Sequence, residues 1–484
     1  MEIPNTFEKA RRLAGHTGKM IVVGVLVIIC WIASLLVLGI ISERSSRQSE
    51  AEMQIAEQWG RPQLIAGPVI VVPFNKLIAT TNAPSQIVRQ NLYILPKELN
   101  ADVKLEPEVR SRGIFSAPVY RSHMAMSGSF RLPSPSEQIS LDITPSSLIW
   151  REATLVMGLS DTRNITVTDL KLDGGALSFV PGSSMWNVNG MGVQAPIPRL
   201  SSPTGGVTIR PYIGFKIDFD VTGSKGISFL PLGEVTKVSA SAPWGSPSFF
   251  GAYLPDTETI NKNDFKATWH ISSLGRSYPS AWVGTSGGMS LSSDAVSYPE
   301  AFFDSGTRVK PINVYSNSGE KYGQALASSA FGVNLFREVT FYTLVSRTVK
   351  YAILFIALTF LAFYLFEVIS RTRVHPFQYL LIGAALVLFY LLLLSFSEHI
   401  GFALAYLLSS ILTLGLVTAY SASVLKAKSR AWIIAAILIV LYAYLYAILQ
   451  LENFALLFGT LFLFVALAAV MRATRKIEWY SQVE

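Results

Sequence analysis

Two serine motifs come closest to the residue spacing of a hydrolase. Residues 284–288 read GTSGG and fit G-x-S-x-G, the nucleophile elbow. That elbow needs a helix after the serine and a later histidine. The segment that follows, MSLSSDAVSYP, is a poor helix, and the only later histidines, His375 and His399, lie at expected membrane turns on opposite sides. Residues 318–321, SGEK, match S-x-x-K of penicillin-recognising enzymes, but the chain has no K-T-G. We therefore interpret both serines as turn residues and predict no catalytic residue.

Motifs for cofactors and metals are equally weak. Residues 190–195, GMGVQA, fit the dinucleotide fingerprint with Ala last, but Pro196 and Pro198 argue against the helix that would hold a pyrophosphate, so we expect a loop. No two of the five histidines have the i, i+4 spacing of a zinc helix, and a single Cys excludes a multi-Cys site. The sequence predicts no cofactor and no metal. Residues 164–166, NIT, form a glycosylation sequon.

Ionisable residues near the ends of apolar runs are the remaining candidates. Glu367 stands about one turn from the inner end of a run, near Arg371, and we interpret it as half of an ion pair at the headgroup level. His375 shares the basic turn that follows. Glu398 and His399 occupy an outer turn, either as a solvated turn or as a pH-sensitive contact. These five are candidate interaction residues. No apolar run carries a charge near its centre, which argues against ion-coupled transport.

Composition indicates that lipid is part of the solvent. Half of the 484 residues are hydrophobic and only 15% are charged, against about 25% in a typical soluble protein. The net charge of +8 is not a nucleic-acid signal, because residues 42–350 hold 28 Lys and Arg against 25 Asp and Glu. The other 12 basic residues all sit near the ends of apolar runs, where they report topology. We expect no nucleic-acid partner.

Six apolar runs predict six transmembrane helices. Each approaches the roughly 20 residues that a helix needs to cross hydrocarbon. The first is longer than the apolar region of a cleaved signal peptide, so we interpret it as a retained anchor. A short polar helix should follow it and end at Trp59, before Gly60 and Pro62. The six runs are residues 21–41, 351–370, 377–396, 400–425, 432–449 and 454–471.

The Lys and Arg residues alternate between the turns. They occupy the turns after residues 370, 425 and 471, while the turns at 397–399 and 450–453 have none. By the positive-inside rule, this pattern places both termini in the cytoplasm. The expected organisation is a cytoplasmic N-terminus at 1–20, the anchor at 21–41, a periplasmic domain at 42–350, a five-helix bundle at 351–471 and a cytoplasmic tail at 472–484.

The residue pattern from 61 to 331 is typical of β-structure. Short apolar runs are broken by Gly, Pro, Asn and Ser, and the segment FKIDFDV alternates apolar and polar residues with period two. We expect an antiparallel sandwich or stacked sheets, as one domain or two. The fold class is therefore an α+β membrane protein with a large antiparallel β-rich domain outside the membrane.

Three segments resemble the CreD family, bacterial inner-membrane proteins also called Cet. They are PQLIAGPVIVVP at 62–73, SPSFFGAYLP at 246–255, and the long run from KYAILF to SEHIGF at 350–402. The family has His just before the PSF of the second segment, where this chain has Ser246, so no role for that His carries over. The resemblance implies the cell inner membrane and a link to envelope integrity, and it supplies no catalytic residue.

We therefore predict a non-enzymatic envelope-integrity protein. Its partners would be the lipid bilayer and a periplasmic protein or envelope component bound by the outer domain. The alternative is a lipid or small-molecule transporter that uses the C-terminal bundle as its conduit. An envelope hydrolase would be a third class, but it lacks a credible nucleophile and base.

The topology can be tested with reporter fusions. Fusions after Ser49, Asp264, His399 and Asn453 should report an outside location, because those turns lack Lys and Arg or belong to the translocated domain. Fusions after Thr372, Lys428 and Gln482 should report the cytoplasm. An outside signal at Thr372 would contradict the scheme.

Overall fold

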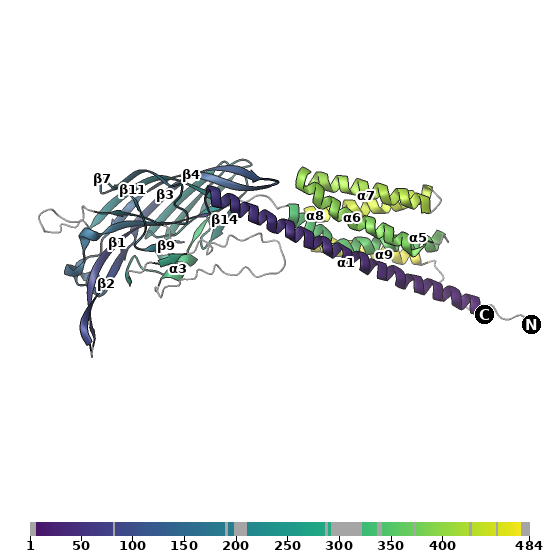
Figure 1. Ribbon diagram of the computed structural model, residues 1–484, viewed down its shortest axis with the longest axis horizontal. Coiled ribbons are helices and arrows are strands. Elements are labelled where there is room, and N and C mark those ends of the chain that lie inside the picture. Colours follow the sequence, from purple (N-terminus) through teal and green to yellow (C-terminus); the bar gives the residue numbers. More distant parts are fainter. Residues whose placement is uncertain are drawn as a thin grey trace, which may run out of the picture. The chain divides into compact units, whose positions relative to one another are not determined.

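Two units make up the chain, and each is described by itself. The computed structural model describes residues 6–80, 83–188, 192–197, 211–285, 289–291, 322–335, 341–370, 374–424, 428–451 and 454–475. One unit is helical and comprises Met1–Ser49 with Val339–Glu484; the other, Glu50–Glu338, is rich in strands. Figure 1 shows the coiled ribbons of the first and the arrows of the second.

Helix α1 runs without a break from Thr6 to Trp59. The apolar run and the polar segment after it were expected as two helices, but no Gly or Pro interrupts them between residues 40 and 59, and the hydrogen bonding continues. The helix ends at Trp59, as predicted from Gly60 and Pro62. Its last ten residues, Glu50–Trp59, belong to the strand-rich unit.

The helical unit contains most of the apolar helices. Four described helices are long and apolar enough to cross a membrane, and α4 with α5 makes a fifth if the pair, bent by 45°, is one broken span. The apolar part of α9, Leu457–Arg472, is shorter, so six spans remain a prediction. The helices after α1 are α4 (Phe341–Lys350), α5 (Ala352–Ser370), α6 (Pro376–Ile400), α7 (Phe402–Val424), α8 (Lys428–Gln450) and α9 (Ala455–Thr474).

One expected turn lies slightly later than predicted. Residues 397–399 were assigned to a turn, yet α6 continues through them to Ile400. The helix ends at Gly401, which adopts a φ of 77°, a conformation that glycine reaches without steric cost. Polar residues alone do not stop a helix, whereas a left-handed glycine does.

Close contact between helices of this unit depends on Gly383 in α6. A Cβ at this position would lie 2.3 Å from Cys30 Sγ of α1 and 2.9 Å from Phe360 Cζ of α5. Cys30 is buried and packs here as a small hydrophobe. The absence of a side chain at Gly383 therefore lets the three helices meet.

Two large sheets form the strand-rich unit. Among the described residues, one sheet has nine strands and the other has eight. The first contains, along its path, β14 (Pro247–Gly251), β19 (Phe331–Leu335), β12 (Gly226–Phe229), β1 (Gln63–Thr80), β5 (Thr154–Leu159), β10 (Val193–Pro196) and β8 (Val180–Pro181), with β2 (Ala83–Ile94) and β17 (Ala281–Thr285) beside it. The second contains β15 (Thr257–Ile260), β16 (Phe265–Ser272), β13 (Val235–Ala242), β3 (Pro96–Arg112), β4 (Phe115–Arg131), β11 (Tyr212–Ser224), β6 (Thr166–Leu172) and β7 (Gly175–Ala176). Strands β9 (Trp186–Val188) and β18 (Met289–Leu291) form a small third sheet, and the short helices are α2 (Pro135–Ser140) and α3 (Gly323–Ser328).

A single hydrophobic core joins the two large sheets. Buried side chains of β1 and β5, such as Val69 and Leu155, belong to the same cluster as Val103 and Phe219 from β3 and β11. Strand β11 alternates exposed and buried residues along FKIDFDV, which confirms the period-two prediction. The unit is thus a sandwich, and the eight-stranded sheet presents its polar outer face to solvent.

The sheets are mixed, which corrects the expectation of antiparallel pairing. Most pairs are antiparallel, but β1 with β12, β3 with β13 and β9 with β18 run parallel. The two strands of each parallel pair are far apart in the chain. The long connection between them allows the second strand to run in the same direction as the first. Alternation along a strand records which face is buried and carries no information on the direction of its neighbour.

Gly383→Ala should destabilise the helical unit. The added methyl must displace Cys30 Sγ or the Phe360 ring, and overpacking of this kind costs about 2 kcal/mol. The measurement is the thermal unfolding temperature of the full chain in detergent. Gly415→Ala in α7 is the matched control, because a Cβ there meets nothing within 4 Å. Adding Cys30→Ala should restore part of the loss; an unchanged unfolding temperature in Gly383→Ala would contradict this packing.

Candidate functional site

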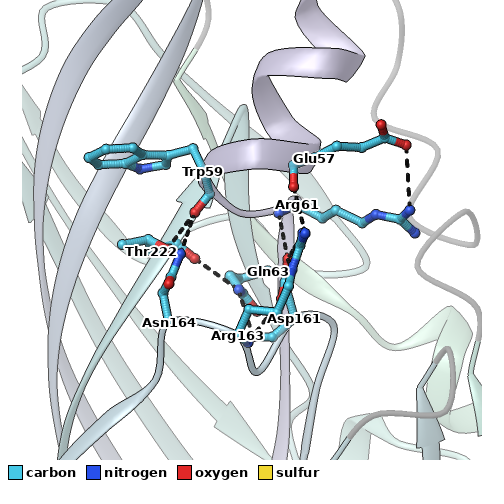
Figure 2. A network of polar contacts seen from close by, with 8 residues as sticks. All are labelled: Glu57, Trp59, Arg61, Gln63, Asp161, Arg163, Asn164 and Thr222. Atoms are coloured by element: carbon cyan, nitrogen blue, oxygen red, sulfur yellow. Dashed lines mark hydrogen bonds and ion pairs between the residues drawn. The ribbon is translucent and has the colours of Figure 1, made fainter.

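The end of α1 is held by side chains of the strand-rich unit, from β11 and from the turn between β5 and β6 (Figure 2). The last carbonyl groups of a helix have no partner within it. Here the carbonyl of Trp59 accepts hydrogen bonds from Asn164 Nδ2 at 2.8 Å and Thr222 Oγ1 at 2.7 Å. The carbonyl of Glu57 accepts from Arg163 Nη1 at 2.5 Å. A cation at this position also opposes the negative end of the helix dipole.

Asp161 holds Arg163 in place. Its carboxylate is 2% exposed and receives Arg163 Nη2 at 2.5 Å and the backbone N–H of Arg61 at 3.2 Å. Burial alone would raise the pKa of Asp161, but the hydrogen bonds from Arg163 and Arg61 outweigh it and hold this pKa below its ordinary value. The same pairing raises the pKa of Arg163. Gln63 Nε2 bridges the Asp161 carbonyl and the Thr222 carbonyl at 3.1 and 2.9 Å.

A polar groove of about 570 Å³ lies beside this helix end, on the eight-stranded sheet. We call it the sheet groove. The Arg121 guanidinium lies 5.6 Å from the centre of the Trp59 ring, and Arg110 covers the same ring at 4.4 Å. Glu106 faces Arg121 across β3 and β4. The lining residues are Trp59, Glu106, Arg121, Ser122, His123, Asn164, Thr166, Asp220, Val221 and Thr222.

The sheet groove has the chemistry of a binding site. His123 Nδ1 lies 2.7 Å from Asp220 Oδ1, and both side chains are about half exposed. Among the described residues, no hydroxyl or thiol is hydrogen-bonded to His123, so the pair lacks the nucleophile of a hydrolytic triad. No group of three or more His, Cys, Asp or Glu in the described chain could hold a metal ion. The groove therefore offers hydrogen-bond donors, hydrogen-bond acceptors and the indole surface of Trp59.

The predicted site residue Glu367 lies in a buried polar cluster of the helical unit. Its carboxylate forms an ion pair with Lys19 of α1 and accepts hydrogen bonds from the Tyr379 hydroxyl at 2.9 Å and the Val374 N–H at 3.1 Å. Glu367 was expected to pair at the headgroup level with Arg371, which lies outside the described residues. The partner that the structure shows, Lys19, is 348 residues away in the sequence.

The remaining predicted site residues do not gather in one place. His375 caps α6, where its Nδ1 accepts the N–H of Phe377 at 3.2 Å. Glu398 is nearly buried; it accepts the Tyr342 hydroxyl at 3.0 Å and lies 3.8 Å from Arg44 of α1. His399 is exposed, and its ring contacts the carbonyl of Ser395 in its own helix. Only the contacts of Glu398 connect different helices, because His375 and His399 each contact their own helix.

The motifs with catalytic or cofactor spacing lie only in part among the described residues. Ser286 and Ser318 lie outside the described residues. The end of GMGVQA, expected to be a loop, belongs to β10, which pairs with β5. A strand at this position lacks the helix N-terminus that a dinucleotide needs.

Sequence reasoning missed Lys19, Arg44 and the sheet groove. The alternation of FKIDFDV places Asp220 on the solvent face, which was a usable signal for one wall of the groove. Trp59 and Arg121 come from elements far apart in the chain, and nothing in the local pattern of either predicts that they meet.

Comparison with known proteins gives consistent matches over nearly the whole length. A family model described as inner membrane protein CreD matches residues 16–480. Inner membrane protein CreD of Escherichia coli (strain K12) is 30% identical over 459 residues, which cover 94% of this chain and 92% of that protein.

Asp161→Asn should weaken the strand-rich unit at neutral pH. The folded pKa of Asp161 is lowered, so its stabilising effect is present above the ordinary Asp pKa of about 3.9 and is lost as pH falls through the lower folded pKa. We expect a cost of about 2 kcal/mol at pH 7, the scale of a hydrogen bond to a charged group. Thermal unfolding of the full chain in detergent at pH 7 and pH 3 would measure it.

The difference between Asp161→Asn and the unmodified chain should shrink at pH 3. Glu152→Gln is the control, since Glu152 also forms a 2.5 Å ion pair, with Arg89, but is 40% exposed. An exposed pair contributes little to stability. A loss of equal size in both variants, or one that does not depend on pH, would count against the role given to Asp161.

Proposed function

Since the chain belongs to the CreD family of inner membrane proteins, we propose that it is a non-enzymatic protein that supports cell envelope integrity. It does so by binding an envelope component or a protein partner through the strand-rich unit. The sheet groove is the observation that carries this proposal. It is concave, lies on a solvent-facing sheet and combines charged, amide and aromatic groups, as binding sites do.

The proposed placement puts the strand-rich region, residues 42–350, in the periplasm and both termini in the cytoplasm. The positive-inside pattern supports it. Within the helical unit, two ion pairs of α1 add support: Lys19 with Glu367 and Arg44 with Glu398. Lys19 and Arg44 stand about 38 Å apart along an ideal helix axis. This separation fits a hydrocarbon core of about 30 Å with a charge in each headgroup layer.

The non-enzymatic assignment rests on chemistry. The His123–Asp220 pair of the sheet groove has no nucleophile hydrogen-bonded to it among the described residues. The buried carboxylate of Glu367 is fully engaged by Lys19, Tyr379 and Val374, so it is poorly placed to exchange a proton with a substrate.

A second candidate function, lipid transport, is favoured by an apolar groove between α7 and α8. It has a volume of about 500 Å³ and a lining of aliphatic and tyrosine side chains, and the Tyr406 hydroxyl is already bonded to the Tyr442 carbonyl at 2.8 Å. Such a groove accepts an acyl chain. The lining residues are Ala403, Leu404, Tyr406, Leu407, Ser410, Ile411, Leu414, Ile439, Tyr442, Ala443 and Tyr446.

Photo-crosslinking in intact cells tests both functions. A benzophenone amino acid at Thr166, in the sheet groove, should form adducts with the bound envelope component or protein, which mass spectrometry identifies. Lys237 is the control, because it is exposed on the same sheet and does not line the groove. Arg121→Gln should lower the adduct yield at position 166 several-fold, because it removes the groove's guanidinium.

The outcome decides between the alternatives. Adducts at position 166 no more abundant than at position 237 would reject the sheet groove as a binding site. Lipid adducts confined to a probe at Leu407, in the apolar groove, would favour the transporter.

A further inference from the structure

The hairpin of β3 and β4 extends past the rest of its sheet. β13 pairs with β3 only as far as Lys104, and β11 pairs with β4 only as far as Val119. The pairing of β3 with β4 continues to Arg112 and Phe115. Among the described residues, the last part of the hairpin is therefore a two-stranded ribbon without a sheet neighbour. Such a ribbon is marginal in water by itself, so it depends on another element.

The last turns of α1 support the ribbon. Ile55 packs against Ala117, and both are buried. Further along, Trp59 Nε1 donates to the Tyr120 carbonyl at 3.2 Å. Trp59, at the end of α1, contacts Tyr120, whereas Ile55, one turn earlier, contacts Ala117, which is nearer the apex of the ribbon. The ribbon therefore runs back along the last turns of α1.

The apex of the ribbon combines apolar and basic side chains. Ile114 is 50% exposed and Val109 is 43% exposed. Arg110 is paired with Glu108 at 3.1 Å, whereas no ion pair of Arg112 occurs within the described residues. Exposed aliphatic residues beside arginines suit the boundary between anionic headgroups and acyl chains.

The ribbon is supported by the same helix that carries the apolar run at 21–41. α1 has no break between that run and Trp59, so the element that supports the ribbon is continuous with an expected membrane span.

We propose that the β3–β4 apex docks on the bilayer surface. Arg112 contacts the phosphates of anionic phospholipids, and Ile114 enters the interface. The contact gives the strand-rich unit a lipid attachment of its own, in addition to its covalent connections. The proposal concerns a different surface from the sheet groove and does not depend on what that groove binds.

Depth-dependent fluorescence quenching tests the docking. The full chain with Cys30→Ala and Ile114→Cys carries a polarity-sensitive fluorophore and is reconstituted in liposomes with about one-third phosphatidylglycerol. Nitroxide lipids labelled at the headgroup should quench it several-fold more than the same fluorophore at Leu77→Cys. Leu77 is the control because it is 64% exposed on another two-stranded ribbon, formed by β1 and β2.

Charge dependence is the second readout. Adding Arg112→Gln, or replacing phosphatidylglycerol with phosphatidylcholine, should at least halve the quenching at position 114 and leave position 77 unchanged. Arg112 is chosen because Arg110 stacks on Trp59 and its loss would disturb the helix end. Equal quenching at the two positions would overturn the proposal. So would quenching at position 114 that is the same with and without Arg112 or phosphatidylglycerol.

Discussion

The carbonyl groups that end α1 must find donors, and the attachment of α1 to the strand-rich unit depends on them. Arg163, Asn164 and Thr222 supply the donors. Arg163 can do so because a buried carboxylate, Asp161, fixes its guanidinium. With the helix end secured, Trp59 becomes a wall of the sheet groove. A long helix that otherwise ends in solvent would fray over its last turn; here its last carbonyl groups are hydrogen-bonded to the strand-rich unit.

The sequence predicts elements better than it predicts their partners. The end of α1 at Trp59 and the alternation along β11 follow from local signals, because glycine, proline and period-two burial act within a few residues. The partner of Glu367 could not be predicted in this way, since Lys19 lies 348 residues away. Parallel pairing was missed for the same reason. Apolar periodicity predicts which face of an element is buried, but it does not predict which distant segment packs against that face.

The segments that carry the family resemblance have mainly structural roles. PQLIAGPVIVVP forms the buried start of β1. SPSFFGAYLP contains Gly251, whose φ is 100° and whose Cβ would lie 2.1 Å from the Ala330 carbonyl oxygen. The long third segment contains Gly383 at the crowded meeting of three helices. Because these segments are closely packed, the resemblance is a strong indication of the fold. None of the residues that line the sheet groove lies in the three segments.

The hydrogen bonds of Asn164 have a practical consequence for producing the protein. Asn164 is the acceptor of the NIT sequon, and the same Nδ2 that an oligosaccharyltransferase would modify is bonded to the Trp59 carbonyl and to Thr222 Oγ1 at 3.1 Å. In a eukaryotic secretory host, a glycan at Asn164 would compete with closure of the helix end during folding. The usual remedy, Asn→Gln at the sequon, would lengthen the side chain and misplace that same donor. Thr166→Ala abolishes the sequon and leaves the Asn164 amide in place, so it is the substitution that suits such a host.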